Sequence, residues 1–302
     1  MGSTLQLTIA GDGVDRSTAG SAWRAVSDEF DAVDAAMSRF RADSAVTRLN
    51  GMIGSVESFT PVEPRLYYGI AAAERARRST GGRFDACVLV HLDHLGHTGA
   101  SLPDTARRPT DRPRDCWVAR QPRARAVSLL QPIDLGGIGK GLALRWSAQR
   151  LMDQMPAGTD IGFLLDAGGD LVAGGPSPDG GPWSIGIEDP FGAQDPVAVT
   201  NLSAGSLCTS SIRLGRWRAD DGREAHHIID PASGESAHTG LVAVTVAGPD
   251  PAWSEVWSKA LFLAGESRIA NEARQRGMAV WWIDEVGQLS MTPAARAVTT
   301  WP

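Results

Sequence analysis

The chain has 302 residues, of which 42% are hydrophobic and 21% charged, a composition typical of a globular protein with a large core. The formal net charge is −6 and no long basic run is present, which argues against a general nucleic-acid-binding protein. No apolar run reaches membrane-spanning length, so we expect no membrane insertion.

The first residues, MGSTLQLTIAGDG, have neither a basic start nor a long apolar stretch, so a signal peptide is not expected. Three cysteines, Cys87, Cys116 and Cys208, are far apart and odd in number. This spacing indicates neither a disulfide framework nor a metal knuckle and favours a reducing compartment. We therefore expect a cytoplasmic protein.

Hydrophobic periodicity predicts both strands and helices along the chain. Alternating Leu5, Leu7 and Ile9 predict a first strand over residues 4–10, and an apolar stripe predicts a helix over residues 17–37. Residues 60–63, Thr-Pro-Val-Glu, have the pattern of a capping box and predict a helix to about residue 78. Further strands are expected at residues 127–130, 161–165, 183–187, 197–201, 241–247 and 278–283, and further helices at residues 142–152, 253–264 and 267–276.

Two stretches have no clear periodicity. Residues 96–115 are rich in Pro, Arg, Asp and Thr, which predicts an exposed loop inserted into one unit rather than a linker between domains. Residues 204–211 are mostly small, and no element is assigned to them. We find no internal repeat.

A glycine-rich stretch from Asp134 to Gly141, DLGGIGKG, lies between an expected strand and an expected helix. Glycines allow close approach to a ligand, and a helix start offers free N–H groups, so a phosphate-bearing ligand is indicated. The P-loop pattern fails because Asp134 stands six residues before Lys140 and Gly141 replaces its Ser/Thr, and the dinucleotide fingerprint fails at Leu142. A turn that only packs a helix on a sheet remains the alternative.

Six blocks in this order resemble the FAD:protein FMN transferase family, the ApbE-type flavin transferases. They are MGSTLQLTI, SRFRADSAVTRLN, TGGRFDACV, IDLGGIGKG, LLDAGGD and HHIIDPASG, with a weaker seventh in WSEVWSKALFLAG. The resemblance covers nearly the whole chain and implies an α+β, T-fold-like unit of mixed sheets and packed helices over residues 1–302. It also implies FAD as a substrate, whose FMN half passes to a Thr or Ser of an acceptor protein with release of AMP.

The same resemblance implies roles for individual residues. His227 or Asp230 would be the general base, and Lys140 would neutralise phosphate charge. The resemblance assigns FAD binding to Met1, Phe40 in place of the family's stacking tyrosine, Arg83, Phe84, Asp85, Asp134, Lys140 and the backbone of Ile228. Such a site would act by positioning and charge neutralisation.

One departure from the family concerns the metal. The carbonyl of Gly137 matches a ligand of Mg²⁺, and the family's helix offers an aspartate and, four residues later, a threonine. Here those two positions are Glu255 and Lys259, and an ammonium cannot coordinate a cation. Either the metal is held more weakly, or Lys259 replaces part of its charge. A simple ion pair on a helix surface is a third interpretation.

Simpler interpretations stand beside several of these roles. His227 could be structural, and His226 is expected to be scaffold. Asp166 and Asp170 could cap turns as well as touch a ligand, and the histidines at 91, 94 and 97 are interpreted as scattered surface residues. The alternatives at the level of function are an FAD pyrophosphatase, a non-catalytic FAD-binding protein and transfer of FMN to a small molecule.

Overall fold

The computed structural model describes residues 4–12, 14–53, 59–97, 99, 117–155, 160–213, 215–219 and 222–301. The chain forms two compact units, each built from separate segments. The first comprises Met1–Phe30, Lys140–Leu214 and His238–Pro302, and the second comprises Asp31–Gly139 and Gly215–Ala237. Because the segments of the two units alternate along the chain, neither unit is a continuous piece of sequence. The single catalytic unit expected for residues 1–302 stays a prediction.

The first unit is built on a seven-stranded sheet. Its strands, in order across the sheet, are β1 (Leu5–Ala10), β5 (Gly162–Ala167), β6 (Asp170–Gly174), β9 (Gly205–Ser211), β12 (Leu241–Gly248), β13 (Ala279–Asp284) and β14 (Leu289–Met291). A second sheet has the order β15 (Thr299–Trp301), β8 (Ala198–Leu202) and β7 (Trp183–Ile187). The helices are α5 (Gly139–Gln154), α6 (Pro251–Ala264), α7 (Glu266–Gln275), α8 (Pro293–Arg296) and the first part of α1 (Arg16–Met37).

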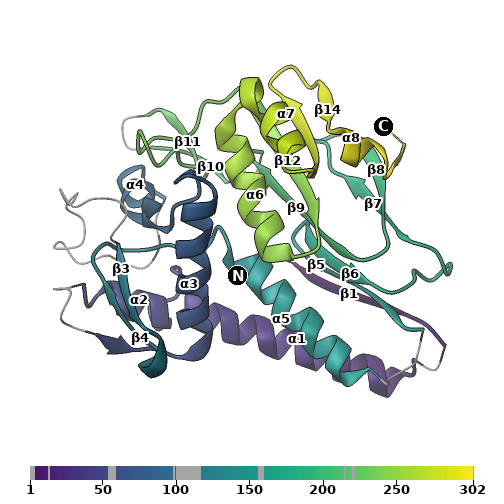
Figure 1. Cartoon of the computed structure of the whole chain (residues 1–302), viewed down its shortest axis with the longest axis horizontal. Helices are drawn as coiled ribbons and strands as arrows, with labels where there is room; N and C mark the ends of the chain where they lie inside the picture. The colour runs from purple at the N-terminus through teal and green to yellow at the C-terminus, as the bar shows by residue number, and fades with distance from the viewer. Residues whose placement is uncertain are drawn as a thin grey trace. The chain divides into compact units, whose positions relative to one another are not determined.

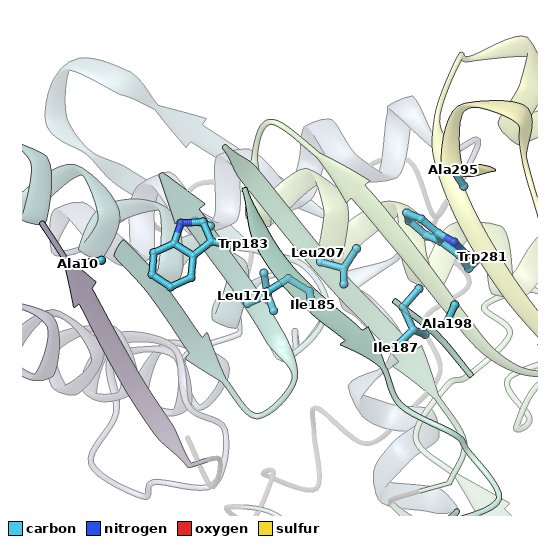
Figure 2. Close-up of a cluster of buried hydrophobic side chains, with 10 residues drawn as sticks. Ala10, Leu171, Trp183, Ile185, Ile187, Ala198, Leu207, Trp281 and Ala295 are labelled. Carbon is cyan, nitrogen blue, oxygen red and sulfur yellow. The ribbon is translucent and has the colours of Figure 1, made fainter. Parts of the chain in front are cut away.

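The two faces of the large sheet are covered differently, because successive side chains of a strand point to opposite faces. On β6, Leu171 and Ala173 belong to a core with the β7–β8 sheet, whereas Val172 packs with α1 and α5. Figure 2 shows the first of these cores, in which Trp183 and Trp281 are the largest side chains. Helices α1 and α5 therefore cover one face at this strand, and the second sheet together with α8 covers the other.

The small residues at 204–211 form the central strand β9, to which the sequence analysis assigned no element. Helix α6 lies along β9 and β12 (Figure 1). Ser206 and Ser210 on β9 bond to Ser254 and Ser258 of α6 at 2.8 and 2.7 Å. Small side chains permit this close approach, and their hydroxyl groups form hydrogen bonds with one another. The residue types of β9 therefore suit packing against α6, and they lack the apolar alternation by which a strand is predicted.

The second unit combines short helices with two small sheets. The larger sheet has the order β2 (Thr60–Pro61), β4 (Ala126–Leu129) and β3 (Val118–Gln121), and β10 (Arg216–Arg218) pairs with β11 (Glu224–His226). The helices are the remainder of α1, then α2 (Ala45–Asn50), α3 (Pro64–Ser79), η1 (Ala86–Val88), α4 (Leu89–His94) and η2 (Pro122–Ala124). The Asn50 amide donates to the carbonyl of Ile133 and accepts from its N–H, both at 2.9 Å, and so fixes the segment before the glycine-rich stretch.

The expected capping box is wrong by three residues. Thr60 and Pro61 pair with β4, and helix α3 begins at Pro64 after Glu63. The Glu63 carboxylate accepts from the N–H groups of Arg65 and Leu66 at 3.0 and 2.7 Å. A second proline follows Glu63, so a proline again stands at the first helical position, and the side-chain cap forms only at this second start.

The described part of the chain has the α+β composition that was expected, but its neighbouring strands all run antiparallel rather than in mixed directions. None of the described helices is both long and apolar enough to cross a membrane. The predicted loop at residues 96–115 lies outside the described residues except for Gly96, His97 and Gly99.

Candidate functional site

Lys140 is at the start of helix α5 and pairs with a buried carboxylate. Its Nζ lies 2.6 Å from Oδ2 of Asp170, the first residue of β6. The other oxygen of Asp170 accepts from the Thr209 N–H at 2.9 Å. The Asp170 side chain is 3% exposed, whereas that of Lys140 is 28% exposed. Asp170 therefore anchors the lysine, a role the sequence analysis did not assign, while Asp166 caps the preceding turn through the Gly169 N–H.

Glu255 is a second buried carboxylate of the first unit that pairs with a lysine. Its Oε2 accepts from the Gly141 N–H at 2.8 Å, and its Oε1 accepts from the Lys259 Nζ at 3.3 Å. The side chain of Glu255 is 1% exposed. The N–H of Gly141 is thus bonded within the protein, so it is not among the free N–H groups that the start of this helix was expected to offer a ligand. The Lys259 pair is also not a surface pair, because its carboxylate is buried.

Gly141 lacks a side chain for a steric reason. A Cβ at this position would lie 2.5 Å from the Pro251 carbonyl oxygen and 2.5 Å from the Ala252 Cα. The start of α5 therefore touches the start of α6, and this contact brings Glu255 to the Gly141 N–H. Among the glycines of the motif, none has a positive φ, so close packing rather than turn geometry explains Gly141.

The charges of this cluster shift the ionisation of its members. Burial by itself lowers the pKa of Lys140, but the Asp170 and Glu255 carboxylates outweigh it and raise that pKa above its ordinary value. Burial raises the pKa of Glu255, and Lys259 opposes the shift. Burial and the same two carboxylates raise the pKa of the Cys208 thiol well above its ordinary value. Cys208 therefore stays protonated and is no nucleophile.

The α6 residues do not fit a divalent metal. Both oxygens of Glu255 already accept hydrogen bonds, one of them from an ammonium that would repel a second cation. Over the residues that the structure describes, no group of three or more His, Cys, Asp or Glu side chains could hold a metal. Gly137, the other expected ligand, belongs to the second unit.

Arg39 is the centre of a polar cluster in the second unit that the sequence analysis missed. Its side chain is buried, its Nε lies 3.3 Å from Asp134 Oδ2, and its NH1 donates to the His97 carbonyl at 3.1 Å. The other oxygen of Asp134 accepts from the Gly136 N–H at 2.8 Å. Asp134 thus holds the glycine-rich turn. The sequence feature that could have indicated a role for Arg39 is its position next to Phe40 in the block SRFRADSAVTRLN.

Phe40 presents an exposed ring, as expected for a stacking residue. The ring is 62% exposed, and the Arg39 guanidinium carbon lies 4.2 Å from its centre. His97 contacts the Phe40 ring edge-on at 5.9 Å and the Trp217 ring at 4.4 Å between centres. Burial, then the charge of Arg39, lowers the pKa of His97. His97 is therefore a half-buried neutral member of an aromatic cluster and not a scattered surface histidine.

Two residues of the predicted triplet Arg83-Phe84-Asp85 make contacts within the second unit. Phe84 is buried, and its N–H donates to the Thr80 hydroxyl at 3.0 Å. Asp85 caps η1 through the Cys87 N–H at 2.9 Å and pairs with Arg77 at 3.0 Å. Both residues thus maintain the local fold, and Arg83 is half-buried.

The block HHIIDPASG folds on itself. The His226 ring is buried, with Nε2 3.0 Å from the Ala237 carbonyl and Nδ1 accepting from the Ile228 N–H at 3.3 Å, which agrees with a scaffold role. The Ile228 carbonyl accepts from the N–H of Ala237, three residues beyond the block, so the backbone expected to contact a ligand is bonded within the protein. Asp230 accepts from the Ala232 N–H at 2.9 Å and from the Ser233 hydroxyl at 3.4 Å. Its carboxylate is therefore engaged in holding a turn.

His227 and Met1 complete the predicted set. The half-buried His227 ring lies close to Gly215, where a Cβ would come within 2.7 Å of Nδ1. Met1 lies outside the described residues. The structure thus brings Lys140 and Glu255 into one cluster in the first unit, and brings Phe40 and Asp134 each into contact with Arg39 in the second.

Comparison with known proteins shows what this chain is similar to. The model of the ApbE family matches residues 1–282. The FAD:protein FMN transferase of Salmonella typhimurium is 26% identical over 308 residues, covering 95% of this chain and 83% of that protein. A protein of the same name from Klebsiella pneumoniae is 30% identical over 245 residues, covering 78% of this chain and 73% of that protein.

Two solved structures show the same fold. The ApbE protein of Thermotoga maritima superposes with a TM-score of 0.84 at 24% identity, covering 98% of this chain and 96% of that chain. The flavin transferase ApbE from Vibrio cholerae superposes with a TM-score of 0.78 at 23% identity, covering 99% and 96%. The expected α+β fold is thereby confirmed.

Proposed function

The chain belongs to the ApbE family, and we propose that it is an FAD:protein FMN transferase acting on a Thr or Ser hydroxyl of an acceptor protein. The hydroxyl oxygen attacks the phosphorus of the FMN phosphate, the bond from that phosphorus to the bridging oxygen breaks, and AMP leaves. The observation that carries the proposal is the family match over residues 1–282, whose relatives bear this name.

The lysine–carboxylate cluster supports a role in phosphate binding. The side chains of Lys140 and Lys259 are 28% and 21% exposed, whereas those of their partners Asp170 and Glu255 are 3% and 1% exposed. The side chains of this cluster that are accessible to a ligand are thus the two lysines, which carry positive charge. Ammonium groups held in place can offset the negative charge of the bound pyrophosphate and the charge that develops on the phosphate of the leaving AMP.

The second unit supports flavin binding. The exposed Phe40 ring offers a face for stacking on the flavin ring system, and the Arg39 guanidinium fixes its position from one side. Asp134 pairs with Arg39 and accepts from the Gly136 N–H, so we propose that it positions the arginine and the glycine-rich turn rather than contacting the flavin itself. We assign Met1 and Arg83 to the same ligand, on the resemblance alone.

His227 is the better of the two proposed bases. Both oxygens of the Asp230 carboxylate already accept hydrogen bonds within its own turn, which leaves them less available to an incoming hydroxyl group. An imidazole near neutral pH is suited to accept the proton of the attacking hydroxyl. The proton then passes from His227 to solvent.

Product analysis tests the proposal. The protein is incubated with FAD alone and with FAD plus protein extract from its source cells, AMP is quantified, and covalent flavin is detected by fluorescence on a denaturing gel. AMP together with a fluorescent protein band supports the transferase. AMP with an equal amount of free FMN would mean a pyrophosphatase. AMP with flavin on a small molecule would mean another acceptor, and bound FAD without AMP would mean a non-catalytic binding protein.

A further inference from the structure

Lysine is almost absent from this protein. The chain has 29 Lys and Arg residues, yet only Lys140 and Lys259 are lysines. Both lie in the same cluster, each beside one buried carboxylate. An ammonium on a narrow stem occupies less room than a planar guanidinium and suits such places better. Because arginine is used at every other basic position, the two lysines indicate that a compact cation is needed at residues 140 and 259.

Glu255 needs a positive partner inside the protein. A buried ionised carboxylate is unstable unless it is paired and hydrogen-bonded. The Gly141 N–H and the Lys259 ammonium meet this need, at 2.8 and 3.3 Å. Lys259 lies one turn along the same helix, so the pair forms without any ligand.

The pair also changes what the site can accept. A divalent ion at Glu255 would have to displace Lys259 or sit beside its ammonium, and like charges repel strongly where water is scarce. The Lys259 side chain is 21% exposed, whereas that of Glu255 is 1% exposed, so a ligand has access to the lysine rather than to its buried partner. A phosphate could therefore meet Lys259 directly.

We propose that Lys259 is the resident cation of Glu255, so that the protein binds the phosphates of its substrate through Lys140 and Lys259 without a divalent metal at this carboxylate. The substrate class rests on the proposed function. The absence of a metal at Glu255 does not, because it follows from the ion pair alone.

The first test uses metal alone. Mn²⁺ is titrated into the protein without FAD, and free Mn²⁺ is followed by its electron paramagnetic resonance signal. We expect no binding by the wild type at Glu255. Lys259→Thr removes the ammonium and adds an oxygen four residues after Glu255, and should create a Mn²⁺ site that Lys259→Thr/Glu255→Gln lacks. Mn²⁺ binding by the wild type that disappears in Glu255→Gln would overturn the proposal.

The second test uses FAD binding measured by calorimetry in a chelator and in Mg²⁺. The wild type should bind FAD equally under both conditions. Lys259→Thr should lose about tenfold or more in affinity in the chelator, the loss typical of one charge-assisted hydrogen bond, and regain it with Mg²⁺. Wild-type binding that requires Mg²⁺, left unchanged by Lys259→Thr, would overturn the proposal.

The two tests separate the two claims. Failure of every variant to bind FAD would contradict the proposed function, while the Mn²⁺ titration would still decide the role of Lys259. Lys259→Thr leaves a buried carboxylate unpaired, so thermal unfolding is measured for each variant with and without Mg²⁺. Stabilisation of Lys259→Thr by Mg²⁺, absent in the wild type, supports the proposal. If Lys259→Thr does not fold, the wild-type titrations, read against Glu255→Gln, decide the question by themselves.

Discussion

Lys140 and Asp170 link helix α5 to the large sheet, with Nζ 2.6 Å from Oδ2. The pair joins the glycine-rich motif to the block LLDAGGD. Asp170 is buried and also accepts from the Thr209 backbone, so the link connects three elements at one carboxylate. It fixes the ammonium that we propose for phosphate binding.

Lys140→Ala should weaken both the fold and FAD binding. Removing one partner of a buried ion pair destabilises by about 3–5 kcal/mol, and the partial exposure of Lys140 places this case near the lower value. Loss of a charged donor to phosphate should reduce FAD affinity by about 1.5–3 kcal/mol. Urea unfolding and calorimetry measure the two effects. Lys140→Ala/Asp170→Asn should recover part of the stability but none of the FAD affinity. Unchanged FAD affinity in Lys140→Ala would remove Lys140 from the site.

Two glycines of the motif should respond in opposite directions to alanine. Gly141→Ala places a Cβ against the Pro251 and Ala252 backbone and should destabilise by about 1–3 kcal/mol, the usual range for overpacking. Gly139→Ala meets no atom within 4 Å and should stabilise by about 0.4–1 kcal/mol. Denaturant midpoints compare the two variants. Equal destabilisation by both would show that the motif needs glycine for its backbone conformation instead.

Phe40→Ala should affect FAD binding without affecting stability. An aromatic stacking contact contributes about 0.5–1.5 kcal/mol beyond its buried area, so the FAD dissociation constant should rise about 2- to 10-fold. Phe191→Ala is a matched control, because that ring is 58% exposed and lies in the first unit outside the proposed site. Calorimetry with FAD and a thermal melt measure both variants. A loss of FAD affinity of the same size in Phe191→Ala would contradict a specific role for Phe40.

The two adjacent histidines should separate stability from catalysis. His226→Ala leaves the Ile228 N–H and the Ala237 carbonyl without their ring partner and should destabilise by about 1–3 kcal/mol. His227→Ala should leave the melting temperature nearly unchanged and lower the rate of AMP release by about 10²- to 10⁴-fold, the range for general-base catalysis. Thermal unfolding and single-turnover kinetics give both values. A His227→Ala variant with full activity would point to another base.

Local pattern predicted many elements well. Alternation at residues 183–187 coincides with β7 (Trp183–Ile187). The gap between the helices expected at residues 253–264 and 267–276 contains Gly265, which separates α6 from α7 at a positive φ of 76°. Strand β9 was not predicted because its side chains are small on the face that meets α6, and that partner lies far along the chain. The start of α3 was misplaced because two prolines, at 61 and 64, offered similar start signals.

The sequence by itself determined the residue types that can do the chemistry. It showed two lysines in all, a glycine-rich stretch, an aromatic residue at position 40 and a lysine where a metal ligand was expected. Only the tertiary structure decided their partners. The Gly141 N–H meets a carboxylate 114 residues away, and Asp134 meets Arg39. Periodicity and capping depend on residues that are neighbours along the chain. The ionisation and the hydrogen-bond partners of a buried side chain depend instead on which distant segments pack against it.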